Sequence, residues 1–217
     1  LRLWEAKSTA PVDMNYYSTG EYLRAVESQA MAEVISKVLY PADNHREGKS
    51  LRLKQQYFFV SATIQSIFRK HLAHYGTLYN FHEKHVIQIN DTHPTLVIPE
   101  MMRLLLDEQG MSWDDAWYIT THTVAYTNHT VLAEALERWP QDLVQELLPR
   151  IWMILCEIND RYLAELREFF HGDENKLQEM AVIWGGEVRM ANLCVAACFA
   201  VNGVSALHSD ILRKDVF

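Results

Sequence analysis

The chain has 217 residues and a mass of 25.2 kDa, and 49% of its residues are hydrophobic, so it can bury a sizeable core and is not disordered as a whole. Its 20 Lys and Arg residues against 28 Asp and Glu residues give a net charge of −8, which argues against a nucleic-acid partner. No apolar run approaches the roughly 18 residues of a membrane-spanning helix, and the charged first residues do not resemble a signal peptide, so no membrane partner is expected.

Two long helices are predicted in the first third of the chain. Apolar residues recur at near-helical spacing from Glu21 to Leu39, and Tyr40-Pro41 ends that pattern. The segment from Arg52 to His74 is longer and more apolar, and we expect it to be largely buried. Between them, the segment from Pro41 to Ser50 is predicted to be a polar loop.

Two short strands are predicted next, with helices between them. The alternating, β-branched segment Val86–Asn90 is typical of a buried strand, and Thr123–Thr127 is predicted to be a second one. A helix from about Leu96 to Gln109 is expected to stop at Gly110. Ser112, with Asp115 three residues later, indicates the capped start of another helix.

The last third of the chain is again predominantly helical. The stretch from Leu143 to Phe170 is predicted to be helical with a restart at Pro149, since proline is tolerated in the first turn of a helix. Four elements follow: a hairpin around Gly185-Gly186, an apolar helix at Met190–Ala200, a strand or turn at Val201–Val204, and a last helix capped by Ser209. Strands joined by helical crossovers predict a helix-rich α/β fold.

The three cysteines, Cys156, Cys194 and Cys198, lie in apolar segments. We expect buried free thiols, which are typical of a reducing, cytoplasmic location. Cys194 and Cys198 would share one face of a helix, but too few nitrogen and sulfur ligands lie near them in the sequence to predict a zinc site.

Polar clusters follow both predicted strands, at Asn90–His93 and at Tyr126–His129, and a third polar pair, Asp43-Asn44, lies on the predicted loop. Ligands of open α/β sheets bind beyond the carboxyl ends of the strands. Carboxylates, amides and imidazoles can hydrogen-bond sugar hydroxyls in fixed directions, so these clusters suit a polyhydroxyl ligand.

Each cluster also has a purely structural explanation. Asp91 could cap the turn that follows its strand, and His93 could be a hydrogen-bonded core histidine. Asn128 and His129 could cap a helix starting near Val131, and Asp43 and Asn44 are common turn residues. Residue types and spacing alone leave both explanations open.

Several longer motifs resemble one protein family. The segment Asn90–Pro94 (NDTHP), followed by Ile98–Glu100 (IPE), and the segment Ala125–Pro140 (AYTNHTVLAEALERWP) are similar to segments of the α-glucan phosphorylases, which include glycogen, starch and maltodextrin phosphorylases. Five further segments match in the same order: Leu1–Ala6 (LRLWEA), Val38–Asn44 (VLYPADN), Leu51–Gln55 (LRLKQ), Leu147–Arg150 (LLPR) and Val201–Ser209 (VNGVSALHS). Long ordered motifs over essentially the whole chain are far more specific than one short pattern.

The resemblance implies that residues 1–217 are the latter part of the N-terminal Rossmann-like domain of a GT-B two-domain glycosyltransferase. Such enzymes cleave α-1,4-glucans with inorganic phosphate and release α-glucose 1-phosphate with retention of configuration. Pyridoxal phosphate forms a Schiff base with a lysine of their C-terminal domain. That domain and that lysine are expected to be absent from this chain, so no catalytic residue is expected here, and the isolated fragment is expected to be inactive. No metal site is expected either, since no ligand spacing typical of one is present.

The resemblance also implies roles for individual residues. Asn44 would reach the glucosyl unit from a gating loop that Asp43 helps to order, and the main chain of His129 would bind the 6-hydroxyl of glucose. Asp91 and His93 would lie near the same sugar, with His93 more toward the acceptor side. On the cofactor side, Val204 with Asn202 nearby would approach pyridoxal phosphate. The helix Tyr22–Lys37 resembles the helix through which these enzymes form homodimers.

Two departures from the animal enzymes make the chain similar to bacterial maltodextrin phosphorylases. His45-Arg46 stand where the animal enzymes have two aromatic residues that stack purines. Arg69-Lys70 are followed by a short segment to His85, where the animal enzymes carry a longer insertion that helps to bind AMP. Activation by AMP is therefore not expected.

Two other functions are weighed against the phosphorylase interpretation. One is a non-catalytic module that dimerises through Tyr22–Lys37 or binds sugar, and it would account for the missing lysine without a second domain. The other is a metal-dependent hydrolase that uses Asp91, His93 and His129, although no HExxH-like spacing supports it.

Overall fold

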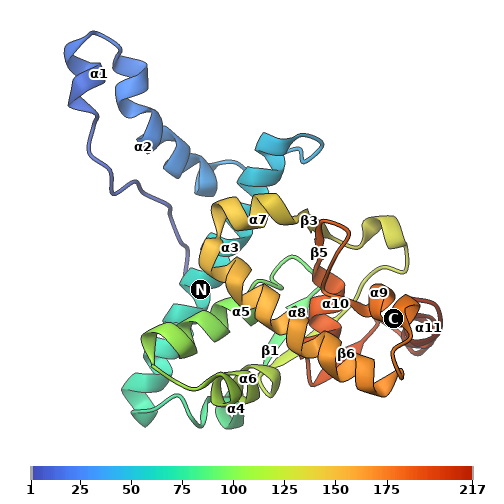
Figure 1. Cartoon of the computed structure of the whole chain (residues 1–217). Coiled ribbons are helices and arrows are strands. Elements are labelled where there is room, and N and C mark those ends of the chain that lie inside the picture. Colours follow the sequence, from blue (N-terminus) through green and yellow to red (C-terminus); the bar gives the residue numbers. More distant parts are fainter. Residues whose placement is uncertain (1, 217) are drawn as a thin grey trace. The chain divides into compact units, whose positions relative to one another are not determined.

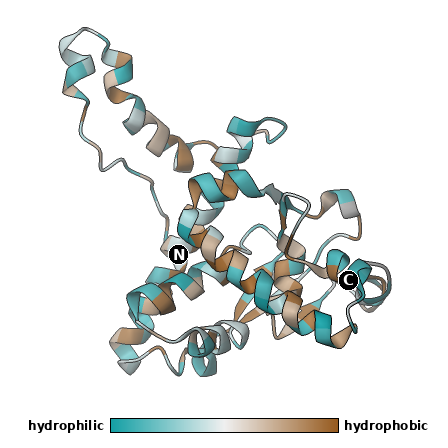
Figure 2. Cartoon of the chain, in the orientation of Figure 1, coloured by the Kyte–Doolittle hydropathy of each residue, from teal (hydrophilic) through white to brown (hydrophobic). Residues whose placement is uncertain are grey.

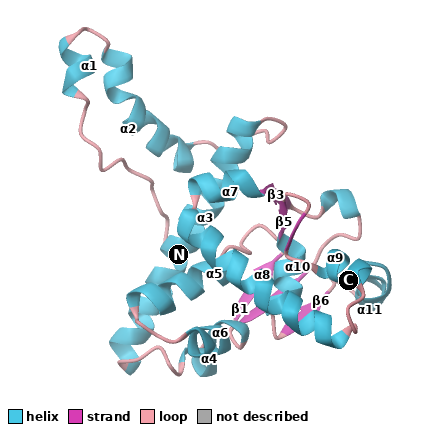
Figure 3. Ribbon diagram, in the orientation of Figure 1, coloured by secondary structure: helices cyan, strands magenta, loops and turns pink. Residues whose placement is uncertain are grey.

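The computed structural model describes residues 2–216 and divides the chain into two compact units, Leu1–Ala62 and Thr63–Phe217. Helices dominate both units, and all the described strands belong to the second unit (Figures 1 and 3). The predicted helix-rich α/β class is therefore confirmed. No helix among residues 2–216 is both long and apolar enough to cross a membrane.

The first unit consists of helices. It contains α1 (Met14–Ser18), α2 (Tyr22–Lys37) and the first part of α3 (Arg46–Tyr75). Asp13 caps α1, because its Oδ1 accepts a hydrogen bond from the N–H of Asn15 at 2.9 Å. The helix α2 lies within the predicted bounds and buries only Ala25, so most of its surface is open to solvent or to a partner.

The predicted loop between the two long helices is shorter than expected. The helix α3 begins at Arg46, not near Arg52, because Nδ1 of His45 accepts a hydrogen bond from the N–H of Gly48 at 2.9 Å and so acts as a cap. Gly48 permits this start, since a Cβ at that position would lie 1.7 Å from the carbonyl oxygen of Ala42.

A three-stranded parallel sheet forms the centre of the second unit. Its strands are β1 (Ile87–Asn90), β2 (Val124–Thr127) and β6 (Ala200–Asn202), in the order β1-β2-β6. The central strand is buried at three of its four residues, as expected for a strand with a neighbour on each side. Both strands predicted in the middle of the chain are confirmed, and the strand-or-turn segment near Val201 is a strand.

Besides the second part of α3, the second unit contains eight further α-helices and two π-helical turns. They are α4 (Phe81–Lys84), α5 (Val97–Arg103) with the π-helical turn η1 (Leu104–Glu108), α6 (Trp113–Thr121), α7 (Gln141–Leu147), α8 (Pro149–Phe169), α9 (Glu174–Met180), α10 (Met190–Ala197) and α11 (Ala206–Ile211) with η3 (Leu212–Val216). The predicted cap at Ser112 and the restart at Pro149 are confirmed. Figure 2 shows the amphipathic character of α8, whose hydrophilic and hydrophobic residues alternate along its length.

A second, antiparallel sheet packs beside these helices. Its strands are β3 (Arg138–Pro140), β5 (Glu187–Arg189) and β4 (Ile183–Trp184), in the order β3-β5-β4. The predicted hairpin is confirmed, because Gly185 and Gly186 join β4 to β5 with φ values of 62° and 82°. Two consecutive residues with positive φ are what a tight hairpin turn of the I′ type requires, and glycine meets that requirement best.

Three predicted details of the second unit are wrong. No α-helix starts near Val131, where a loop leads into the single 3₁₀ turn η2 (Ala133–Ala135). Ser209 does not cap the last helix, because Ser205 is in extended conformation and its Oγ accepts the N–H of His208 at 3.1 Å. The helix α10 ends at Ala197, not at Ala200, because Ala200 belongs to β6.

The cysteines are free thiols as predicted, but only Cys194 is fully buried.

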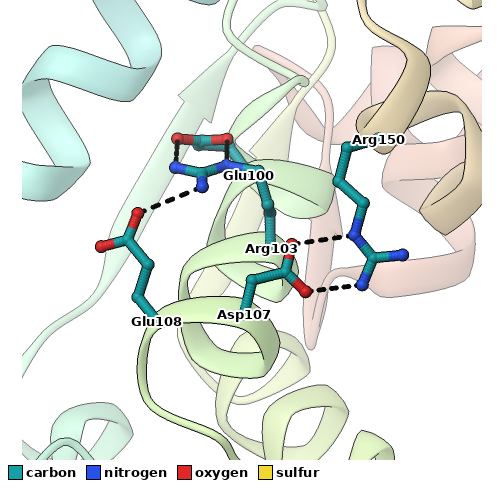
Figure 4. A network of polar contacts seen from close by, with 5 residues as sticks. All are labelled: Glu100, Arg103, Asp107, Glu108 and Arg150. Carbon is teal, nitrogen blue, oxygen red and sulfur yellow. Dashed lines mark hydrogen bonds and ion pairs between the residues drawn. The ribbon is translucent and has the colours of Figure 1, made fainter.

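A buried carboxylate of α5 is paired within its own helix, next to an ion pair that links η1 to α8 (Figure 4). The side chain of Glu100 is 0% exposed, and Arg103 donates to its two oxygens from Nε at 2.8 Å and from Nη2 at 2.9 Å. Arg103 also donates to Glu108 from Nη1 at 3.1 Å. Arg150 of α8 donates to the two carboxylate oxygens of Asp107, from Nε at 2.8 Å and from Nη2 at 2.6 Å. The two-pronged geometry neutralises a charge that would otherwise be costly to bury.

The two arginines of this network are expected to differ in their contribution to stability. Arg103→Met would leave the buried carboxylate of Glu100 without its main partner, and we expect it to lower the free energy of unfolding by about 3–5 kcal/mol. Arg150→Met breaks a half-exposed pair and should cost about 1 kcal/mol or less. Chemical denaturation of the protein, followed by circular dichroism, measures both. Equal effects of the two substitutions would show that the burial of Glu100 carries no special cost.

Candidate functional site

The carboxyl ends of three parallel strands meet at one edge of the central sheet. Asn90, Thr127 and Asn202 are aligned across β1, β2 and β6. The register therefore brings together the segments that follow these strands, Asn90–His93, Thr127–His129 and Asn202–Val204. The predicted placement of both polar clusters at a strand-end edge is confirmed, and the third segment joins them there.

A row of polar side chains crosses the exposed face of the sheet at this edge. Nε2 of Gln88 donates to Oγ1 of Thr127 at 2.8 Å, and Oγ1 of Thr127 donates to Oδ1 of Asn202 at 3.3 Å. Aligned residues of parallel strands share a face, so Asn90 belongs to the same row. Gln88 is not among the predicted site residues, although its position two residues before Asn90 on a strand indicates that both point to the same face.

His129 is held by this row. Its Nε2 lies 2.5 Å from Oδ1 of Asn90, although the two residues are 39 positions apart in the chain. An amide oxygen only accepts hydrogen bonds, so Nε2 of His129 is the donor, and in a neutral ring Nδ1 is then an acceptor. The site thus presents an imidazole ring of fixed orientation at the exposed edge of the sheet.

On the opposite face, Asn128 fixes the segment that carries His129. Its side chain is 0% exposed, donates to the hydroxyl of Tyr126 at 2.8 Å and accepts from the N–H of Thr130 at 2.7 Å. Its N–H donates to the carbonyl of Asn202 at 2.9 Å and so continues the ladder between β2 and β6. Burial raises the pKa of Tyr126, which keeps the phenol neutral beneath the site.

Asp91 adopts a strained conformation directly after β1. Its φ is 62°, in the left-handed region that aspartate tolerates better than most residues, and its Oδ1 accepts the N–H of Thr92 at 2.7 Å. This contact is what the structural explanation of Asp91, a cap on the turn after its strand, predicts. His93 is exposed in the turn that follows, so the alternative of a core histidine is wrong.

The turn after Asp91 rests on buried groups. Oγ1 of Thr95 lies 3.2 Å from Sγ of Cys194 on α10, and both residues are fully buried. Burial raises the pKa of the Cys194 thiol, so it remains a neutral partner for the hydroxyl. The exposed part of the turn therefore has a rigid base.

The segment after β6 contributes an apolar group to the same edge. Val204 is 60% exposed, and its N–H donates to Nδ1 of His208 at 3.1 Å. Asn202 turns its amide nitrogen to the carbonyl of Gly203 at 2.9 Å. Gly203 is buried, and the ring of His208 lies so close that a Cβ at this position would be 2.8 Å from it.

The two remaining predicted residues, Asp43 and Asn44, belong to the first unit. Oδ2 of Asp43 accepts from Nη1 of Arg52 on α3 at 2.8 Å, and this ion pair ties the loop to the helix. Asn44 is exposed beside it, next to the start of α3. The loop therefore has one anchored and one free polar residue at its tip.

Metal ligation is not supported in the part of the chain that the structure describes. Among residues 2–216, no group of three or more His, Cys, Asp or Glu side chains is arranged to hold a metal ion. Asp91, His93 and His129 therefore do not form such a group.

Comparison with known proteins identifies the class. The sequence profile of the carbohydrate phosphorylase family matches residues 1–217, and the chain belongs to that family. It is 47% identical over 228 residues to the muscle form of glycogen phosphorylase from Ovis aries, and 48% identical to that from Homo sapiens, each match covering 100% of this chain. It is also 47% identical to glycogen phosphorylase from Bacillus subtilis over 214 residues, or 99% of this chain. The chain spans about a quarter of the length of these relatives, 26–27%.

The proton position on His129 can be tested directly. In the unaltered protein we expect nitrogen NMR shifts that place a proton on Nε2, because Asn90 accepts from that atom. Asn90→Ala removes the acceptor and should give a mixture of the two tautomers. Gln88→Ala is the matched control, since Gln88 is an amide of the same strand face that bonds Thr127 instead. A single tautomer in both variants would contradict the assignment.

Proposed function

We propose that this chain is the latter part of the N-terminal domain of an α-1,4-glucan phosphorylase, an enzyme that uses inorganic phosphate to release α-glucose 1-phosphate from a glucan. The main support is the high identity to glycogen phosphorylases over the whole chain, together with an exposed row of amide, hydroxyl and imidazole groups at the strand-end edge. The substrates, glucan and phosphate, and a cytoplasmic location are part of this proposal.

In this proposal, the residues of the second unit bind and orient one glucosyl unit. Sugar hydroxyls both donate and accept, so the acceptor on His129, the exposed His93 and the polar row offer complementary partners. Main-chain groups of His129 are fixed by Asn128 and can hold a hydroxyl at a defined position. The carboxylate of Asp91 would stabilise positive charge that develops on the sugar ring in an oxocarbenium-like transition state.

The loop of the first unit would act as the gate. Asp43 is anchored to Arg52, which orders the loop around the neighbouring Asn44, and in the complete enzyme Asn44 would contact the sugar. Closing a loop over a bound sugar excludes water and fixes the reacting groups. No residue of this chain is proposed as a nucleophile.

Pyridoxal phosphate is the proposed cofactor of the complete enzyme. The segment after β6 suits one side of such a group, because Val204 offers an exposed apolar side chain and Asn202 a polar edge beside it. When bound, the phosphate of the cofactor would supply proton transfer to the substrate phosphate. Within this chain, Val204 and Asn202 only pack and orient, and the lysine that carries the cofactor would come from another domain.

The sugar-binding assignment predicts losses of activity in a phosphorolysis assay of the complete protein. Asn44→Ala, Asp91→Asn and His129→Ala should each lower kcat/KM by about 10- to 100-fold, which corresponds to about 1.4–2.7 kcal/mol of lost transition-state stabilisation. His129→Ala is the weakest probe, because a main-chain contact survives it. Asp91→Asn should leave the fold intact, since asparagine also tolerates the left-handed conformation.

The control for these substitutions is Asn175→Ala on α9, which removes an exposed amide far along the chain from the proposed site. Its kcat/KM should stay within about twofold of the unaltered value. Normal activity in all three site variants would refute the assignment of the sugar site while leaving family membership untouched.

We also propose that the complete protein is a homodimer that associates through α2. This helix exposes Leu23 at 86% and, three residues on, Val26, which share one face. Such an apolar face is costly to leave in water. The same face is the feature that would support the alternative of a non-catalytic dimerising module.

Charge placed on that face should break the dimer. We expect Leu23→Asp to convert a sedimenting dimer into a monomer, because an aspartate would be desolvated in the interface. Ser28→Asp adds the same charge at an exposed position about 140° around the helix and should leave the dimer intact. Sedimentation of the unaltered protein as a monomer at every concentration would contradict the proposal.

A further inference from the structure

A cavity lies in the second unit between the antiparallel sheet and α8, α9 and α10, and none of its lining residues belongs to β1, β2 or β6. Its volume is about 730 Å³, within the range of small-molecule sites. Four basic side chains line it, from β3, α9, β5 and η3, and only one acidic side chain does so. These residues are Arg138, Lys176, Arg189 and Lys214, with Glu179 as the acid.

Two of the basic residues face each other across a strand pair. Arg138 of β3 and Arg189 of β5 are directly opposed in the antiparallel register. Like charges in such positions destabilise a sheet, since their Cβ atoms are only about 5 Å apart. Glu187 offsets the charge of Arg138 by forming an ion pair with it at 3.2 Å. Glu187 also attracts the charge of Arg189, but the ion pair goes to Arg138, so Arg189 is the half of the pair without one among the described residues.

The contacts of Arg189 confirm this imbalance. Its Nη1 donates to the carbonyl oxygen of Gln178 at 2.6 Å and to that of Glu179 at 3.4 Å, both uncharged acceptors at the end of α9. Its Nε is buried and has no hydrogen-bond partner among the described residues. Burial and the neighbouring Arg138 lower the pKa of Arg189, so the surroundings oppose its positive charge.

Pairing within the cavity does not restore neutrality. Lys176 contacts Glu179 at 3.0 Å, and Arg138 contacts Glu187 at 3.2 Å. Among the described residues, Arg189 and Lys214 form no ion pair. Four basic side chains and one acidic side chain in the lining are an excess of positive charge, which is unexpected in a chain whose net charge is −8. It is the arrangement that a doubly charged anion would complement.

We propose that this cavity binds a small phosphate ester with a ring-shaped body. A phosphate group near pH 7 carries between one and two negative charges and accepts the forked N–H groups of arginine well. Tyr162 and Phe170 line the same cavity and offer apolar ring faces to the rest of the ligand. The site is distinct from the proposed sugar site, which lies on β1, β2 and β6.

Phenyl phosphate is a suitable probe, because it combines one phosphate with one ring and is not a sugar. Calorimetric titration of the complete protein should show binding that weakens as salt is added. The double substitution Lys176→Gln with Lys214→Gln should weaken this binding about tenfold or more, and both residues are exposed enough to be replaced without loss of the fold. Arg189→Gln should do the same, but its buried position makes it the second choice.

The matched control is Arg213→Gln, the neighbour of Lys214 in sequence. It is 78% exposed, pairs with Asp210 and does not line the cavity, so the affinity for phenyl phosphate should not change. Inorganic phosphate should bind more weakly than phenyl phosphate, and phenol should not compete. Any phosphate site elsewhere in the complete enzyme would be unaffected by these substitutions, so the difference between variants isolates the cavity.

Three results would overturn the proposal. One is an affinity for phenyl phosphate that is equal in the double variant and in Arg213→Gln. Another is competition by phenol as strong as that by phenyl phosphate. The third is a structure of the complete protein in which an acidic segment of polypeptide fills the cavity. None of these results bears on phosphorolysis, so the glucan phosphorylase proposal would stand or fall separately.

Discussion

The parallel register of β1, β2 and β6 is the constraint on which the site depends. With Asn90, Thr127 and Asn202 aligned, the alternation of side chains sends Gln88, Asn90 and Thr127 to the exposed face and Ile89 and Tyr126 to the core. One more step along the chain continues that alternation into the loops. Asn128 points into the core and His129 outward, so a single register places both the anchor and the binding group.

The same edge shows how strain and burial support an exposed site. Asp91 has a left-handed backbone, and such conformations persist only where the surroundings hold them. Here the turn is held from below by Thr95 against Cys194 and from the side by the N–H of Asp91 bonded to the carbonyl of Thr127. The polar groups that a ligand would meet are thus exposed, while the groups that position them are buried and neutral.

The sequence predicted elements well where the signal is local. Pro149, Ser112 and the Gly185-Gly186 turn act within a few residues, and each was placed correctly. Errors arose where two similar signals compete or where an unusual residue caps a helix. Ser205 and Ser209 are both possible caps by residue type, and the helix starts after Ser205, so Ser209 lies within α11 and accepts from the N–H of Gly203. The early start of α3 depends on a histidine cap, which no residue preference indicates.

The features of both sites that could not be predicted from the sequence depend on contacts between segments that lie far apart in the chain. The two clusters could be placed at strand ends, but the bond between Asn90 and His129 needs the pairing of β1 with β2, 39 residues apart. The opposition of Arg138 and Arg189 likewise needs the pairing of β3 with β5, and β3 itself was not predicted. A parallel register gathers neutral polar groups at one edge, and an antiparallel register forces two cations together at another place. Because the first favours hydroxyl groups and the second an anion, one small domain can offer two sites of different chemistry.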